Sequence, residues 1–227
     1  QQRYFCKSCS KKFIPKDAFY RMRNKQEKIT LCLDLFFRGI STRKIQEHLQ
    51  AFYPHNSSHK TIYKWVVKYS NLIHSKVKDI KLNVGSEIQV DEMEIGKRTS
   101  RYNGWFIDSI DTTTRFMVSS DYVKSRGQKE IREVILNAKK KTEKQIKIVT
   151  TDGYTAYEDV VKKTFGYNLK LNQYNVFHHK VTQLKNEGFN HKIERLHNSV
   201  RHRIKTFRGF HGSLSSANAI MKGFEVY

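Results

Sequence analysis

Between residues 26 and 74, apolar side chains recur at helical spacing in three segments. These segments are "QEKITLCLDLFFRG", which closes at Gly39; "STRKIQEHLQAF", with Ser41 as the expected N-cap; and "SSHKTIYKWVVKYSNLI", after the turn "YPHNS". Two helices joined by a tight glycine turn are typical of a helix-turn-helix, which binds DNA through its recognition helix. We therefore expect a helix-turn-helix domain over residues 26–76, followed by a linker over 77–84.

From residue 85 the pattern changes to short apolar runs of the strand type. "EIQVDEMEI", "GWFIDSID" and "RFMVSSDYV" predict three neighbouring antiparallel strands, the first buried on both faces before Asp91 and exposed after it. A helix "GQKEIREVILNAKKK", a strand "QIKIVTTDG" and a helix "YTAYEDVVKKTF" follow. The weaker pattern "GYNLKLNQYNVFHH" offers one more strand, and two helices close the chain. This order predicts an α/β domain with a mixed sheet over residues 85–227.

The stretch "NHKIERLHNSVRHR" places one acid, Glu194, in a strongly basic helix. At 100° per residue, one face carries the polar side chains Glu194, His197, Asn198, Arg201, Lys205 and Arg208. Another face carries the apolar side chains Ile193, Leu196, Val200, Ile204 and Phe207. The simplest interpretation of the acid is an ion pair on a solvated face, and a functional interpretation requires other acids to converge on it.

The composition favours a folded protein with a polyanionic partner. The 227 residues are 38% hydrophobic, and no apolar run of membrane-spanning length or secretory signal is present, so we expect a cytoplasmic protein with no membrane partner. The net charge of +22 favours nucleic acid as the partner. In the third predicted helix, the side chains expected to contact DNA lie outside the apolar stripe: His59, Lys60, Tyr63 and Lys64. The alternative is a plain three-helix bundle with a solvated basic face.

Cys6 and Cys9 form a single CxxC in "YFCKSCSKKF". A structural Zn²⁺ site needs four ligands, and no second pair lies close by in the sequence. We interpret residues 1–25 as a partial zinc-ribbon-like segment whose remaining ligands would come from upstream residues, with an unligated pair as the alternative. Cys32 fits a helical apolar pattern and is expected in the core.

Asp91, Asp152 and Glu194 are each expected where an element meets an edge of the sheet. Carboxylates from distant segments are a common means of holding Mg²⁺. Two such ions can activate the attacking oxygen and stabilise the leaving oxygen of a phosphoryl transfer. Acids in a basic protein are therefore consistent with chemistry on a nucleic-acid phosphate.

Three blocks resemble the signature regions of the DDE transposases of bacterial and archaeal insertion sequences: "QVDEMEIGKRTSRYNGWFIDSIDTTTRFMV", "IVTTDGYTAY" and "NHKIERLHNSVRHRIKTFRGFHGSLSSANAIMKGFE". The resemblance implies an RNase H-like core, as in retroviral integrases, over residues 85–227. It implies that Asp91, Asp152 and Glu194 are the catalytic metal ligands, and that Arg201 is the basic residue seven positions after the glutamate. Arg201 and Lys205 would then contact phosphates.

The resemblance also implies the reaction and its partners. The expected enzyme cleaves DNA at the terminal inverted repeats of an element and joins the freed 3′-OH to target DNA, using two Mg²⁺ ions for which Mn²⁺ can substitute. A homodimer or larger synaptic complex at the nucleoid is expected. Two alternatives remain: another RNase H-like nuclease, or a non-catalytic DNA-binding protein derived from a transposase.

Other residues are weaker candidates for a site. Glu92 and Glu94 neighbour Asp91 and are alternative ligands. Asp108 and Asp111 flank a hairpin, where Asp commonly forms turns. The segment "FHHK", with His178 and His179, is expected to be a basic DNA-contacting loop, and Trp105 is expected in the core.

Overall fold

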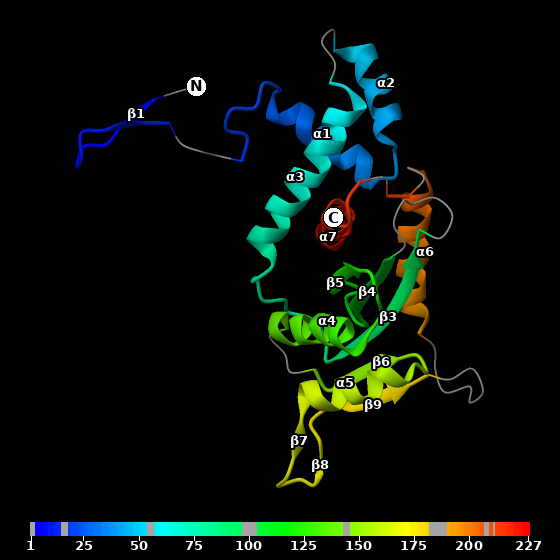
Figure 1. Ribbon diagram of the computed structural model, residues 1–227. Coiled ribbons are helices and arrows are strands. Elements are labelled where there is room, and N and C mark those ends of the chain that lie inside the picture. The colour runs from blue at the N-terminus through cyan, green and yellow to red at the C-terminus, as the bar shows by residue number, and fades with distance from the viewer. Residues whose placement is uncertain are drawn as a thin grey trace.

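The computed structural model describes residues 3–14, 18–53, 57–96, 104–142, 146–181, 190–206, 209–210 and 212–227 (Figure 1). The strands are β1 (Tyr4–Phe5), β2 (Lys12–Phe13), β3 (Glu87–Ile95), β4 (Gly104–Asp111), β5 (Met117–Val123), β6 (Ile148–Thr151), β7 (Tyr167–Asn168), β8 (Gln173–Tyr174) and β9 (Phe177–Lys180). The helices are α1 (Gln26–Phe37), α2 (Thr42–Phe52), α3 (His59–Val77), α4 (Gln128–Lys141), α5 (Thr155–Phe165), α6 (His191–Thr206) and α7 (Leu214–Val226). The loop 97–103 predicted between the first two strands of the α/β domain lies outside the described residues.

The centre of the fold is a five-stranded mixed sheet with the strand order β5-β4-β3-β6-β9. Strands β3, β4 and β5 form the predicted antiparallel meander, while β6 pairs parallel to β3 and β9 pairs parallel to β6. The expected mixed α/β fold is thus confirmed. The segment "FHHK" is strand β9, in line with the weak strand pattern that ends in it and not with its interpretation as a loop, because its backbone extends the sheet beside β6.

The two faces of the sheet bury different cores. Ile88 and Val90 of β3 pack with residues of α4 and α5. Met93 and Ile95, on the other face, pack with residues of α6 and α7. The expectation that β3 is exposed after Asp91 was wrong, since both residues are at most 5% exposed. Strand alternation continues along β3, and the covering helices lie on both sides of the sheet.

Helices α1, α2 and α3 form where the apolar pattern predicts them. Ser41 is the N-cap of α2, and its side chain accepts a hydrogen bond from the backbone N–H of Lys44. Gly39 in the preceding turn has a φ of +97°, a backbone conformation that suits glycine. The third helix extends to Val77, and Leu82 then pairs with Thr142 beside α4.

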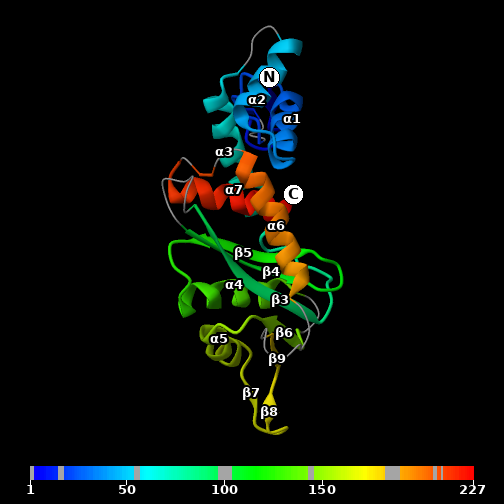
Figure 2. The same ribbon diagram turned by 90° about the vertical axis from the view of Figure 1, so that its right-hand side faces the viewer.

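The three N-terminal helices share a core with α7 (Figure 2). The ring of Phe37 in α1 lies 5.2 Å from the ring of Phe224 in α7. A Cβ atom at Gly223 would overlap the Phe37 ring, so a glycine allows α7 to lie this close to α1. Helices α1 and α3 are therefore packed directly on the C-terminal helix α7.

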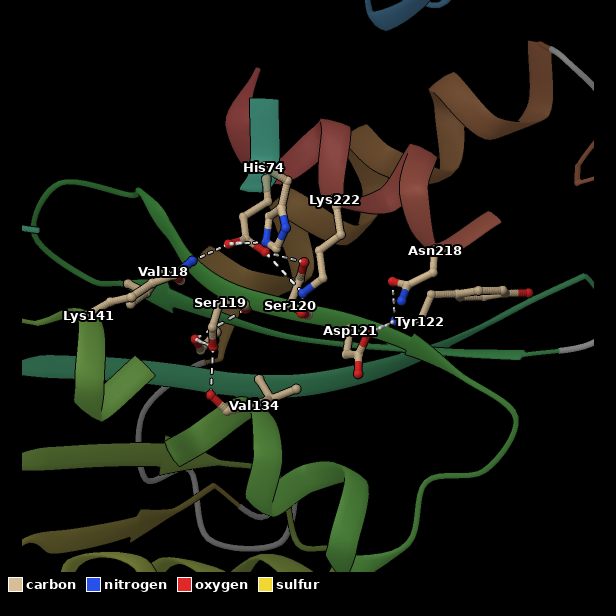
Figure 3. Close-up of polar contacts among 12 residues, drawn as sticks. His74, Val118, Ser119, Ser120, Asp121, Tyr122, Val134, Lys141, Asn218 and Lys222 are labelled. Carbon is tan, nitrogen blue, oxygen red and sulfur yellow. Dashed lines mark hydrogen bonds and ion pairs between the residues drawn. The ribbon is translucent and has the colours of Figure 1, made fainter. Parts of the chain in front are cut away.

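A buried carboxylate on α7 links the same regions through polar contacts. Glu225 is 8% exposed and accepts a 2.7 Å hydrogen bond from Ser120 of β5. It also pairs with Lys141 at the end of α4 and lies 3.9 Å from His74 of α3. Figure 3 shows His74, Lys141 and Ser120 converging over β5. The sequence offered no signal of this network, whose members are far apart in the chain.

Candidate active site

Asp91 lies in the middle of β3, directly opposite Asp108 of β4. Its side chain is 17% exposed, and one carboxylate oxygen accepts a 2.8 Å hydrogen bond from the backbone N–H of Glu92. By strand alternation Asp91 is on the same face as Met93 and Ile95, the face covered by α6 and α7. The carboxylate therefore lies between the central strand and the helix that carries Glu194.

Asp152 follows the last residue of β6, at the carboxyl end of the strand. The parallel register pairs Gln89 of β3 with Thr150 of β6, so continuing it by two residues brings Asp152 beside Asp91. The backbone N–H of Tyr154 donates a 2.9 Å hydrogen bond to Asp152, which fixes this turn. Residues 61 positions apart in the chain thus converge where β6 ends beside the middle of β3, although Asp91 was expected at an edge of the sheet.

The surroundings of Asp91 make its charge costly. Burial, with a smaller contribution from the negative charges of Glu92 and Asp152, raises the pKa of Asp91 to about 7, although His197 acts in the opposite direction. Burial likewise raises the pKa of Glu92. Several carboxylates therefore crowd the region where β3 and β6 lie side by side.

His197 of α6 is inserted between the two opposed aspartates of β3 and β4. Its Nε2 atom lies 2.6 Å from Asp108 Oδ1, and its Nδ1 atom lies 3.6 Å from Asp91 Oδ2. The side chain is 3% exposed, so its predicted place on the cationic outer face of the helix was wrong. Burial lowers the pKa of His197, but the Asp108 carboxylate and then Asp91 raise it above the ordinary value.

Asp108 is fully buried, which corrects its interpretation as a turn former. Burial raises the pKa of Asp108, with the adjacent His197 opposing the shift. Asp111 does form a turn, since it accepts hydrogen bonds from the backbone N–H groups of Gly85 and Thr114. The two aspartates of β4 thus have different roles, because Asp108 lies inside the strand against His197 of α6, whereas Asp111 is its last residue.

Glu92 is on the opposite face of β3 from Asp91. Arg126 donates a 2.9 Å hydrogen bond to it, and the hydroxyl of the buried Tyr157 donates another. The Arg126 guanidinium also stacks on Trp105, 4.4 Å from the ring centroid, and on Tyr154. Trp105 is half-buried against the core as expected, and Arg126, which the sequence reasoning missed, connects it to Glu92.

Glu194 lies in the first turn of α6 and its side chain is exposed. The start of this helix is attached to the sheet, because Gln89 accepts a 3.2 Å hydrogen bond from the Ile193 N–H and Lys192 donates to the Thr112 carbonyl. Glu194 is three residues before His197, so it is on a neighbouring part of the helix surface. Among the residues that the structure describes, no three His, Cys, Asp or Glu side chains are grouped closely enough to hold a metal ion.

The structure leaves the predicted basic contacts accessible to different degrees. Arg201 and Lys205 are exposed on α6, and Arg201 donates a 3.5 Å hydrogen bond to Asn198. Phe207 and Arg208 lie outside the described residues. In α3, Lys60 and Lys64 are exposed, whereas two predicted contacts are half-buried: His59, which contacts Gln46, and Tyr63, which packs against the shared core.

Residues 85–227, well over half of the chain, match a family model described as a DDE domain. The chain belongs to this DDE transposase family. It is accordingly a DDE-type polynucleotidyl transferase with the RNase H-like fold of that family. No curated protein matches the chain in sequence.

Solved structures with distant similarity are integrases and a transposase. The integrase catalytic core domain of HTLV-2, in complex with magnesium, is 15% identical, with 63% of this chain and 86% of that chain covered and a TM-score of 0.42. The simian T-cell lymphotropic virus intasome is 10% identical, with 87% and 64% covered and a TM-score of 0.43. The Mos1 strand transfer complex is 10% identical, with 94% and 77% covered and a TM-score of 0.33.

The acids of this DDE transposase partly fit a divalent cation. Asp91 and Asp152 offer carboxylate oxygens of the type that Mg²⁺ prefers, with water and substrate oxygens as further ligands. Burial is the main cause of the raised pKa of Asp91, and a bound cation would favour the charged form of this carboxylate. Glu194 lies about one helical turn before His197 on α6, and its side chain is exposed.

The N-terminal CxxC lies in the hairpin β1–β2, apart from the acids (Figure 1). The Ser8 hydroxyl lies 3.2 Å from the Cys6 sulfur, and hydrogen bonds from Ser8 and Cys9 lower the pKa of the Cys6 thiol to about 7. A lowered thiol pKa suits a metal ligand. Cys32 is buried, as predicted.

No helix in the described ranges combines the length and the apolar character needed to cross a lipid bilayer.

Proposed function

We propose that this DDE transposase binds the terminal inverted repeats of an insertion sequence, cuts DNA there and joins the 3′ ends to target DNA. The observation that carries the proposal is the convergence of Asp91 and Asp152 on neighbouring strands, beneath a helix that His197 attaches to Asp91. This arrangement brings two acids from distant segments onto neighbouring strands, next to the helix that carries Glu194. The reaction would take place in the cytoplasm, at the nucleoid.

In this proposal Asp91, Asp152 and Glu194 hold two Mg²⁺ ions, or Mn²⁺ in their place. The ions would activate the attacking oxygen and stabilise the leaving oxygen of each phosphoryl transfer. Asp91 and Asp152 would hold the ions together, and Glu194 would turn inward from its exposed position to complete the site. His197 keeps α6 against β3, so that Glu194 starts from a position near the two aspartates.

The basic surface would position the substrate. Arg201 and Lys205, on the exposed face of α6 that also carries Glu194, would contact phosphates near the reacting strand. Lys60 and Lys64 of α3, with His59 and Tyr63 behind them, would contact the element ends. Cys6 and Cys9 would supply two of the four ligands of a Zn²⁺ site, and the protein would act as a homodimer or larger synaptic complex, since two ends are joined in one event.

Strand transfer tests this proposal directly. Labelled duplexes that carry the ends of the source element are incubated with the protein and Mg²⁺, Mn²⁺ or EDTA, beside Glu194→Gln and Asp152→Asn. We expect metal-dependent joined products from the wild type and none from either variant, with DNA binding retained by all three. The matched control is Glu133→Gln, which neutralises an exposed acid on α4 and should leave joining unchanged.

The same assay separates the two alternatives. Metal-dependent cutting without joining, with a preference for RNA:DNA hybrids, would indicate another RNase H-like nuclease. Binding of the ends without cutting in either metal would indicate a non-catalytic DNA-binding protein.

A further inference from the structure

A groove of about 1290 Å³ lies between the N-terminal helices and the segment that joins α6 to α7. One wall is built from the start of α2 and the first turns of α3. The other wall contains Thr206 at the end of α6 and Ser216 in the first turn of α7. Figures 1 and 2 both place the end of α6 and the length of α7 next to the N-terminal helices.

The helix wall of the groove is strongly basic. It carries Arg43, Lys44, Lys60 and Lys64, against the single acid Glu47. All four cationic side chains are exposed, and within the described part of the chain none of them forms an ion pair. Unpaired cations that line a groove attract a polyanion and release its counterions when it binds.

The two walls are held in a fixed relation by close packing. A Cβ atom at Gly212 would lie 2.5 Å from the Tyr63 hydroxyl and 3.2 Å from the Ser216 Cβ, so the segment before α7 approaches α3 very closely. Burial raises the pKa of Tyr63, consistent with its place in this junction. The groove is therefore preformed and does not require the N-terminal helices to move.

We propose that this groove binds the sugar-phosphate backbone of duplex DNA, so that the N-terminal helices and the α6–α7 segment hold one DNA segment together. The inference rests on the proposed function for the nature of the polyanion, and it adds the catalytic region to the DNA-binding surface. Thr206 is 12 residues beyond Glu194 on the same helix, which corresponds to about 18 Å at 1.5 Å per residue. A duplex in the groove would thus lie about five base pairs from the acid of α6.

A negative charge added to the wall that contains Thr206 gives the sharpest test. Thr206 is exposed, and its hydroxyl bonds only to carbonyls of its own helix among the contacts described, so Thr206→Glu adds an anion to the groove without altering α2 or α3. Thr206→Gln is the matched control, with the same size and no charge. Binding of the full chain to a fluorescent 30-base-pair duplex of arbitrary sequence is measured by anisotropy across a salt series.

We expect Thr206→Glu to weaken duplex binding at least tenfold and Thr206→Gln to bind as the wild type does. On the other wall, Lys44→Ala with Lys60→Ala should weaken binding and reduce the salt slope by about two, because each phosphate contact contributes about 0.9. Lys163→Ala with Lys170→Ala removes the same charge from α5 and the β7–β8 hairpin, and should change neither affinity nor slope beyond the general effect of net charge.

Three results would overturn the inference. Wild-type binding by Thr206→Glu, with weak binding by the Lys44 and Lys60 variant, would show that DNA lies on the N-terminal helices alone; the proposed function would survive. Wild-type binding by both variants would place the DNA elsewhere on the protein. Equal affinity for single-stranded DNA or RNA of the same length, with the same response to Thr206→Glu, would show that the groove takes a different polyanion. If the wild type showed no strand transfer while all DNA-binding results were as expected, only the proposed function would be contradicted and the groove inference would stand.

Discussion

Two adjacent acids on β3, Asp91 and Glu92, have opposite surroundings. Glu92 points to the α4 and α5 side, where Arg126 and Tyr157 donate hydrogen bonds to it. Asp91 points to the α6 side, where its carboxylate lies 3.6 Å from His197. The parallel register of β3 and β6 also brings Asp152 beside it. Strand alternation thus separates a carboxylate that is already satisfied by protein donors from one that retains oxygen ligands for a cation. Neighbouring acids in a motif are distinguished by the face of the strand that they occupy.

Neutralising each acid in turn should give the largest difference in strand-transfer activity between the two positions. Asp91→Asn is expected to reduce strand transfer at least about 1000-fold, because a ligand to the reacting ions is removed. Glu92→Gln keeps its shape and part of its hydrogen bonding, so we expect less than about a tenfold loss of activity and about 2 kcal/mol of lost stability. Single-turnover joining and urea unfolding measure the two effects. Equal losses of activity in both variants would contradict the assignment of the ligand to Asp91.

Replacing His197 should have an intermediate effect. His197→Gln retains a donor toward Asp108 but not toward Asp91, so α6 and Asp91 are no longer held together. Outer partners of metal ligands typically affect affinity by about 10- to 100-fold, and we expect Mn²⁺ binding to weaken by that amount.

Calorimetric titration of Mn²⁺ into the metal-free protein measures this affinity independently of catalysis. His202→Gln, which changes an exposed histidine of the same helix, serves as the control and should bind Mn²⁺ normally. Unchanged Mn²⁺ affinity in His197→Gln would show that His197 only packs the helix.

The smallest expected effect is a dependence of stability on pH. The pKa of Asp91 is about 7 in the folded metal-free protein and about 3.8 when unfolded, so burial of its charge costs nothing below the unfolded value and its full amount above pH 7. The stability advantage of Asp91→Asn over the wild type should therefore grow by about 2 kcal/mol between pH 5 and pH 8. Urea unfolding in EDTA checks this, with the exposed Asp159→Asn as the control. A constant difference across this range would contradict the raised pKa.

The regular part of the fold could be predicted from local patterns. The strand-like runs around Asp91 and Asp152 and the helical spacing near Glu194 are signals within a few residues, and the structure has those elements where the patterns place them. The order of elements predicted a mixed sheet, but the parallel pairing that brings Asp152 beside Asp91 came from the structure. The predicted features depend on hydrophobic periodicity and on the order of the elements, both of which can be inferred from a sequence.

The contacts beneath α6 could not be predicted in the same way. His197 and Asp108 are 89 residues apart, and a buried ion pair between them has no local signature. By helical angle His197 falls near the polar face, yet in the structure it is buried against Asp91 of β3 and Asp108 of β4. The pairing of Glu92 with Arg126 was missed for the same reason, since it joins strand β3 to the segment before α4, 34 residues later in the chain.

The contact of Glu225 with His74, Lys141 and Ser120 has a consequence for exchange of parts between transposases. A DNA-binding unit grafted in place of residues 26–76 would remove His74 from this carboxylate and Phe37 from Gly223, and would leave a surface of α7 designed for other side chains. Under the proposed function, we therefore expect new end specificity from substitutions on the exposed faces of α2 and α3, rather than from replacement of the whole unit.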